Sequence, residues 1–213
     1  MVVRNTTLSI NFLRVSAGGN CFMESLGFRK VKDIDIGGLL EEVNEEHWKE
    51  VTLRQDHPES SHKDTESIYL RWSEKMDVKS VFNDLMAVDY PALDRLPVFK
   101  DILGEIFHSV RGEKLGRAML VKLKGEGFID RHVDEGPYAD YYDRFHLCLQ
   151  SGENVNFMID HTSFKHYECC NMQPGELWWF DHKKPHCVDN TNSVDRIHLI
   201  VDIKTSMFRG DGF

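Results

Sequence analysis

A histidine and an acid two residues apart, His132 and Asp134, form the first pattern in the chain that could do chemistry. Side chains at positions i and i+2 of an extended strand lie on the same face, so this imidazole and this carboxylate would converge. Such a pair supplies two ligands of the triad of two histidines and one carboxylate that binds iron(II) and leaves coordination positions open. The third ligand must come from elsewhere in the chain.

Two histidines compete for that third position. His186 lies on a strand-like run that follows a turn, and it precedes Arg196 by ten residues. His182 lies in the turn itself, fourteen residues before Arg196. A turn residue could reach a metal, but we favour His186 because its spacing to Arg196 is ten residues and not fourteen.

Arg196 strengthens this interpretation. A hairpin turn over 190–193 would pair His186 with His198 and place His186 and Arg196 on one sheet face. A buried arginine beside a metal needs an anion, and its planar fork suits a carboxylate. The alternative is an ordinary ion pair of Arg196 with Asp195 or Asp202.

Arg144 and His146 repeat the i, i+2 spacing, on the face opposite Phe145 and Leu147. If the two apolar residues face an outer core, Arg144 and His146 line the mouth of a barrel. The alternative is that Arg144 and His146 face solvent.

The elements that must position these residues change character near residue 115. Before it, we expect an edge strand at 8–15, amphipathic helices over 37–50 and 91–110, and a polar loop at 54–66. After it, short runs of period two are separated by Gly, Pro, Asn and Asp, which is typical of antiparallel sheets. The expected strands cover 119–123, 144–149, 155–159, 175–181, 186–190 and 195–203. The predicted fold is mainly β with flanking helices: a double-stranded β-helix (jelly roll, cupin-like) of about eight core strands.

Length and composition indicate the number of domains, the possible partners and the location of the protein. The 213 residues predict a single domain, 1–213, in which a mixed helical and strand part, 1–114, packs on a catalytic core, 115–205. Twenty-six basic against 35 acidic residues give a formal charge of −9, which disfavours nucleic-acid binding. No run is long and apolar enough for a membrane helix. Five cysteines without a Cys-x-x-Cys pair favour a reducing, cytoplasmic location.

Residues 115–203 resemble the iron(II)/2-oxoglutarate-dependent oxygenases of the aspartyl/asparaginyl β-hydroxylase group, and the related bacterial proline hydroxylases. Four segments carry the resemblance by their order and spacing: 129–137, 144–147, 175–181 and 186–202. The resemblance implies that His132, Asp134 and His186 bind Fe(II). It implies that Arg196 pairs with the distal carboxylate of 2-oxoglutarate, and that Arg144 and His146 lie near co-substrate and substrate.

The chain departs from the group at one ligand and in one loop. Many β-hydroxylases of this group use two histidines only, whereas Asp134 is present here. Residues 138–142 form an inserted loop that could contact a different substrate. The resemblance implies a dioxygenase that couples O2 and 2-oxoglutarate decarboxylation to hydroxylation of a small-molecule or peptide substrate. A non-redox metal-binding cupin and a catalytically inactive small-molecule-binding module remain as alternatives.

Overall fold

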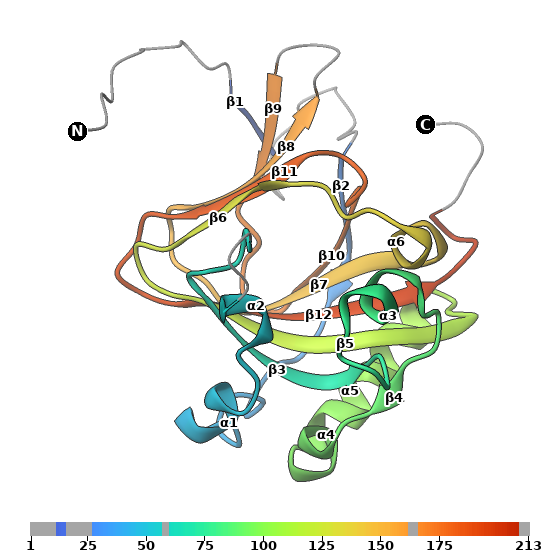
Figure 1. Cartoon of the computed structure of the whole chain (residues 1–213). Helices are drawn as coiled ribbons and strands as arrows, with labels where there is room; N and C mark the ends of the chain where they lie inside the picture. Colours follow the sequence, from blue (N-terminus) through green and yellow to red (C-terminus); the bar gives the residue numbers. More distant parts are fainter. Residues whose placement is uncertain (1–11, 16–26, 57–59, 162–165, 209–213) are drawn as a thin grey trace.

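The computed structural model describes residues 12–15, 27–56, 60–161 and 166–208. Its strands form two facing sheets, which are the upper and lower layers in Figure 1. The five-stranded sheet has the order β1-β9-β8-β11-β6, and the seven-stranded sheet has the order β2-β10-β7-β12-β5-β3-β4. All neighbours pair antiparallel except β1 and β9, which are parallel. The fold is the jelly roll with flanking helices that the sequence predicts.

Eight strands, β5 to β12, fall in the region expected to form the core. Their bounds are Lys114–Leu123 (β5), Phe128–His132 (β6), Asp143–Gln150 (β7), Val155–His161 (β8), His166–Cys170 (β9), Glu176–Phe180 (β10), His186–Asn190 (β11) and Arg196–Lys204 (β12). The strands before them are Phe12–Val15 (β1), Phe28–Asp33 (β2), Thr65–Trp72 (β3) and Val88–Asp89 (β4). From the mixed helical and strand part before residue 115, β2, β3 and β4 extend the seven-stranded sheet.

Alternation along the strands separates two kinds of interior. On the outer face of the seven-stranded sheet, Leu120, Leu199, Leu147 and Leu177 form a row across four neighbouring strands, and all are buried. Burying each such side chain contributes roughly 1.5–3 kcal/mol. The alternate positions face the other sheet, and many of them are polar. This inner face holds the candidate site.

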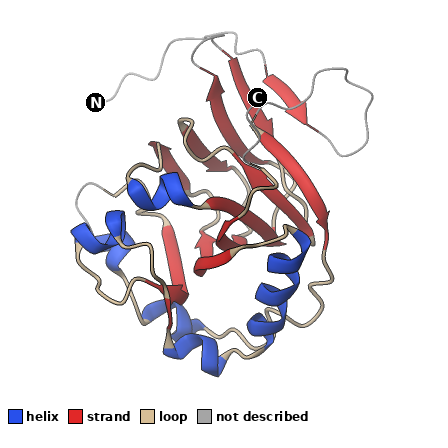
Figure 2. Cartoon of the chain, turned by 90° about the vertical axis from the view of Figure 1, so that its right-hand side faces the viewer, coloured by secondary structure: helices blue, strands red, loops and turns tan. Residues whose placement is uncertain are grey.

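The longest helix lies on the outer face, below the seven-stranded sheet in Figure 1, and is also seen in Figure 2. The helix Val98–Ser109 (α5) buries Phe99, Ile102, Leu103 and Ile106 against the leucine row. The others are shorter: Glu45–Lys49 (α1), Leu53–Asp56 (α2), Val78–Asn83 (α3), Pro91–Arg95 (α4) and Pro137–Tyr141 (α6). None of the described helices is long and apolar enough to cross a membrane.

The predicted helices are shorter than expected, for local reasons. The helix over 91–110 is two helices, because Pro97 has no N–H to donate and excludes Leu96 from helical geometry. In 37–50 only α1 is helical, and it begins where the Asn44 side chain accepts hydrogen bonds from two backbone N–H groups. At the N-terminus, β1 is an edge strand as predicted, and residues 8–11 lie outside the described residues. The polar segment 54–66 is a loop only in part, because α2 ends at Asp56 and β3 begins at Thr65.

The predicted hairpin between β11 and β12 is wrong. His186 pairs with His132 of β6 and Ile159 of β8, whereas β12 pairs with β5 and β7. The turn after Asn190 carries the chain from one sheet to the other, with the Asn190 side chain donating to the carbonyls of Lys124 and Val194. His186 and Arg196 therefore lie on opposite sheets that face each other. A turn signal in the sequence does not distinguish a tight hairpin from such an arch.

Candidate metal and co-substrate site

His132 and His186 are directly opposite each other on β6 and β11. Their ring centroids are 4.3 Å apart. Asp134 follows β6, where its backbone N–H donates to the carbonyl of His182. One ligand atom from each of His132, Asp134 and His186 lies within 4.8 Å of the others. The structure thus brings together the three residues that the sequence singles out for a metal.

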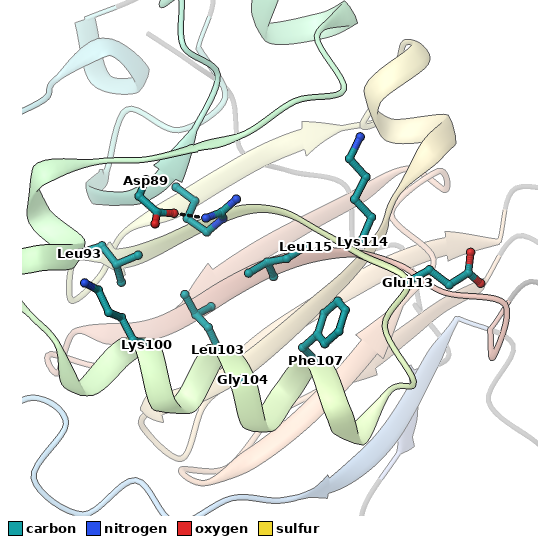
Figure 3. Close-up of a pocket in the computed structure, with 10 residues that line it drawn as sticks. Asp89, Leu93, Lys100, Leu103, Gly104, Phe107, Glu113, Lys114 and Leu115 are labelled. Carbon is teal, nitrogen blue, oxygen red and sulfur yellow. Dashed lines mark hydrogen bonds and ion pairs between the residues drawn. The ribbon is translucent and has the colours of Figure 1, made fainter.

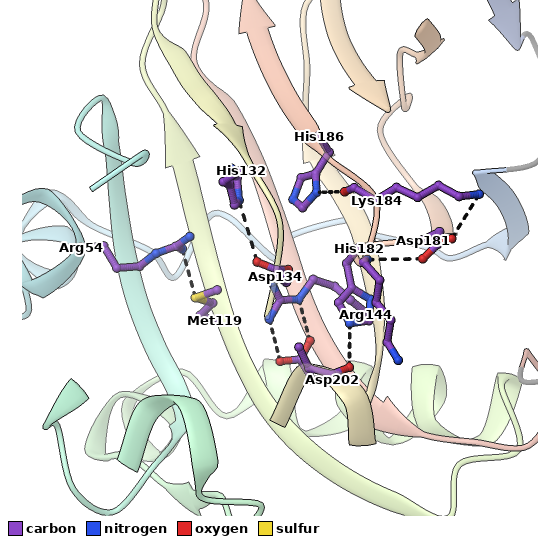
Figure 4. A network of polar contacts seen from close by, with 12 residues as sticks. Arg54, Met119, His132, Asp134, Arg144, Asp181, His182, Lys184, His186 and Asp202 are labelled. Atoms are coloured by element: carbon purple, nitrogen blue, oxygen red, sulfur yellow. Dashed lines mark hydrogen bonds and ion pairs between the residues drawn. The ribbon is translucent and has the colours of Figure 1, made fainter. Parts of the chain in front are cut away.

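Hydrogen bonds orient both imidazoles of this triad. Nδ1 of His132 lies 2.7 Å from the carbonyl of Asp130. Nδ1 of His186 lies 2.9 Å from the carbonyl of Lys184, a contact drawn in Figure 4. A carbonyl oxygen only accepts, so both Nδ1 atoms carry the proton. Nε2 of each ring is left with a free lone pair, which is the atom that a metal would bind.

Asp134 is ionised by its surroundings. Burial alone would raise the pKa of this carboxyl, but the Arg144 guanidinium and the nearby histidines hold it at about 2. Oδ2 of Asp134 accepts from Arg144 at 2.5 Å, and Oδ1 lies 3.9 Å from Nε2 of His132. Burial lowers the pKa of His186 to about 4, so that ring is neutral at physiological pH. Two neutral imidazoles and one carboxylate are a donor set for a divalent metal.

Arg144 is held by the protein itself. It lies opposite Asp202 in the sheet, and its Nε and Nη2 donate to the two carboxylate oxygens of Asp202 at 2.8 and 3.0 Å. Its third hydrogen bond is the one to Asp134. Burial would lower the pKa of Arg144, but the two carboxylates outweigh burial and raise it. Arg144 therefore acts in this structure as the bridge between the triad and β12.

Arg196 is buried without such a partner. Its side chain is 2% exposed, and within the described residues no carboxylate forms an ion pair with it. Asp195 accepts a hydrogen bond from the Gly125 N–H, and Asp202 is paired with Arg144, so the alternative partners are engaged elsewhere. Nη2 of Arg196 lies 3.1 Å from Nδ1 of His198, and its guanidinium lies 5.5 Å from the centre of the Phe157 ring.

Two buried histidines lie beside Arg196. His146 and His198 are 5% and 0% exposed, and their Nδ1 atoms are 3.4 Å apart. Nε2 of each has no hydrogen-bond partner. Because Arg196 only donates, Nδ1 of His198 accepts, and the proton of that ring is on the unpartnered Nε2. Phe157 connects this group to the triad, since its ring lies 6.0 Å from that of His186 and 5.5 Å from that of His146.

Other sequence predictions meet a different environment. His182 is not part of the triad, and its Nε2 lies 3.0 Å from the carbonyl of Ala139. Residues 138–142, expected as an inserted loop, belong mainly to α6, whose Tyr138 hydroxyl accepts from the Arg117 N–H. The sequence reasoning missed His198, although its i+2 spacing from Arg196 was a usable signal. It also missed Arg54, His62 and Tyr69, which come from the region before residue 115.

A cavity lies on the other side of the seven-stranded sheet. It has a volume of about 390 Å³ and is lined by residues of α5, β4 and the start of β5 (Figure 3). Its lining includes Leu103, Phe107 and Lys114 and none of the triad residues.

The chain is similar in sequence to a known protein family and in fold to solved structures. The sequence model of the aspartyl/asparaginyl beta-hydroxylase family matches residues 32–206. The crystal structure of an oxidoreductase of the 2OG-Fe(II) oxygenase family from Burkholderia pseudomallei is similar, with a TM-score of 0.59 at 13% identity, covering 92% of this chain and 95% of that one. A prolyl-4-hydroxylase from Pseudomonas putida aligns with a TM-score of 0.44 at 12% identity, over 66% of this chain and 71% of that one.

Proposed function

Because this chain belongs to the aspartyl/asparaginyl β-hydroxylase family, we propose that it is an Fe(II)/2-oxoglutarate-dependent dioxygenase that hydroxylates a small-molecule or peptide substrate. The observation that carries the proposal is the pairing of a His-Asp-His triad with a buried arginine that has no carboxylate partner in the described chain. A metal-binding fold without redox chemistry has no need of that arginine.

The triad fits iron(II). Its free Nε2 atoms and the Oδ1 atom of Asp134 are three donors from one side, the arrangement that leaves positions open for other ligands. Asp130 and Lys184 would fix the imidazoles through their carbonyls, and Arg144 would fix the carboxylate. Loss of such a contact to a metal ligand typically weakens metal binding by about 10–100-fold.

The group around Arg196 fits 2-oxoglutarate. A buried guanidinium and two buried imidazole nitrogens without partners are costly unless a ligand satisfies them. A carboxylate would accept hydrogen bonds from the Arg196 guanidinium and from the protonated Nε2 of His198, with the other end of the dicarboxylate toward the triad. Arg144 and His146 would lie beside the co-substrate, but Arg144 already holds two carboxylates and contributes mainly position.

The bound groups and the residues of the chain would have different roles in the reaction. When bound, Fe(II), 2-oxoglutarate and dioxygen supply the oxidising power for C–H hydroxylation, with succinate and CO2 as co-products. The chain would bind the metal through the triad and orient the co-substrate through Arg196. Phe157 and Phe180, both buried between the triad and His146, would keep water from the reacting atoms.

We also propose the compartment and the kind of substrate. The buried cysteines Cys148, Cys170 and Cys187 are free thiols, which suits a reducing compartment such as the cytoplasm. The net charge of −9 favours a small substrate over nucleic acid.

An anaerobic titration tests the site. Mn(II) and then 2-oxoglutarate are added to the wild-type protein, to His186→Ala and to Arg196→Lys, and binding heats are measured. We expect His186→Ala to lose Mn(II) affinity and Arg196→Lys to lose 2-oxoglutarate affinity with Mn(II) binding unchanged. Tight Zn(II) binding with no affinity for 2-oxoglutarate would favour the non-redox cupin instead. Binding of 2-oxoglutarate without succinate release across a broad substrate panel would favour the inactive binding module.

A further inference from the structure

A third arginine, Arg54 of α2, reaches the site beside Met119. Figure 4 shows its side chain extending over Met119 toward Asp134. Its Nη1 lies 3.4 Å from the Met119 sulfur, which is a weak acceptor. No ion pair joins Arg54 to a carboxylate in the part of the chain that the structure describes. Burial lowers the pKa of this guanidinium, which reflects its desolvation.

Two further polar groups beside Arg54 lack partners. Tyr69 pairs with Met119 across β3 and β5, so both side chains lie on the inner face. Tyr69 is 2% exposed, and its hydroxyl has no hydrogen-bond partner. The ring of His62 lies 4.8 Å from that of His132, and its Nδ1 is also unpartnered. These three groups surround a place next to the triad on its His132 side.

Two other arginines on the inner face, Arg144 and Arg117, do not share this situation. Arg144 holds Asp134 and Asp202. Arg117 stacks on Tyr138, with its guanidinium 3.6 Å from the ring centre, and donates to Ser73. A desolvated guanidinium without such compensation is expensive, and a bidentate carboxylate is the ligand that its fork matches best.

We propose that the substrate carries a carboxylate that binds Arg54 and Tyr69 beside the metal triad. The proposal rests on the proposed function, because it assigns the second anion site of the same active centre. The co-substrate would then be anchored through Arg196 on the His186 side, and the substrate through Arg54 on the His132 side. Two separate arginines let the site hold two acids at once without competition.

Matched pairs of acids and amides test the proposal. The full-length protein is loaded anaerobically with Mn(II) and saturating 2-oxoglutarate, so that Arg196 is occupied. Calorimetry then measures binding of the L-amino acids and their primary amides, which probe a free α-carboxylate. N-acetyl-aspartate α-amide and N-acetyl-asparagine α-amide probe a side-chain carboxylate within a peptide backbone.

The expected result is that at least one acid binds wild type tenfold or more tightly than its amide. Arg54→Gln should abolish this preference and leave 2-oxoglutarate affinity unchanged, Arg54→Lys should restore part of it, and Tyr69→Phe should reduce it. Arg95→Gln is the matched control, because Arg95 is an exposed arginine paired with Glu50 and its loss changes the net charge equally.

Three outcomes would overturn the inference. In one, every acid and its amide bind wild type equally. In another, no acid binds a protein that does bind 2-oxoglutarate. In the third, Arg54→Gln weakens acid and amide alike. Failure of the wild-type protein to bind 2-oxoglutarate would instead count against the proposed function, whereas the acid-to-amide ratio reports on Arg54 alone.

Discussion

Arg144 and Arg196 stand on neighbouring strands of one sheet, point to the same inner face, and are used differently. Arg144 makes three hydrogen bonds to Asp134 and Asp202. Arg196 is more deeply buried, yet it contacts only the His198 nitrogen and the Phe157 ring among the described residues. The comparison separates an arginine that completes the fold from one whose partner must arrive from solution. Residue type and sheet face alone would have made the two equivalent.

Removing the paired arginine should have the largest effect on stability. Arg144→Leu leaves Asp134 and Asp202 as buried carboxylates without a counterion, and breaking such a pair costs about 3–5 kcal/mol. Urea unfolding of the metal-free protein measures this loss. Arg131→Leu is the control, since its ion pair with Asp160 is at the surface and should contribute less than about 1 kcal/mol. Equal stability of the two variants would mean that Arg144 is not structural.

Removing the unpaired arginine should act on binding instead. Arg196→Met takes away a buried charge that nothing in the described chain compensates, so the metal-free protein should unfold at the same or a higher urea concentration. Its affinity for 2-oxoglutarate should fall 100-fold or more, which corresponds to about 2.7 kcal/mol. A variant that is clearly less stable and binds 2-oxoglutarate normally would reverse the two roles.

A conservative change sharpens the comparison. Arg196→Lys keeps the charge but loses the bidentate fork, so 2-oxoglutarate should bind about tenfold more weakly, or about 1.4 kcal/mol. Arg144→Lys should change 2-oxoglutarate affinity less than it changes stability. We would measure both affinities anaerobically with Mn(II) bound. If Arg144→Lys abolishes binding and Arg196→Lys leaves it untouched, the co-substrate anchor is Arg144.

The neighbours of Arg196 should make stability depend on pH. Burial lowers the pKa of His146 and of His198 well below 6.5, so the unfolded chain takes up protons that the folded chain does not. Above about pH 6.5 the two histidines therefore do not make the free energy of unfolding depend on pH, and below it that free energy decreases as the pH falls. Each should remove about 1 kcal/mol between pH 6.5 and 5.5. His198→Gln should flatten the profile of unfolding free energy by that amount, and an unchanged profile would show that His198 does not titrate as described.

The sequence predicts the strands after residue 115 well, because alternation there reflects two different environments. Leu147 and Leu199 face the helices, whereas His146 and His198 face the other sheet. The same local logic finds His132 and Asp134, which are two residues apart. Local spacing does not predict which strands pair. The connection between β11 and β12 contains ordinary turn residues, and no local pattern in the sequence indicates which sheet β12 joins.

The residues that the sequence reasoning missed share one property. Arg54 and Tyr69 come from α2 and β3, and they meet the triad only because β3 pairs with β5. Their role depends on contacts between distant segments, which no local spacing encodes. The same holds for Asp202, which pairs with Arg144 and not with Arg196, although Arg196 is nearer in the sequence.

Turnover of 2-oxoglutarate tests the central claim most directly. Purified protein with Fe(II), O2 and 2-oxoglutarate is incubated with the acids that bind it, and succinate and CO2 are quantified. The account predicts equal amounts of the two products, dependent on Fe(II), with the loss of both in His186→Ala and Arg196→Met although the latter folds normally. Succinate formed at the wild-type rate by His186→Ala, or by Arg196→Met at low 2-oxoglutarate concentration, would contradict it.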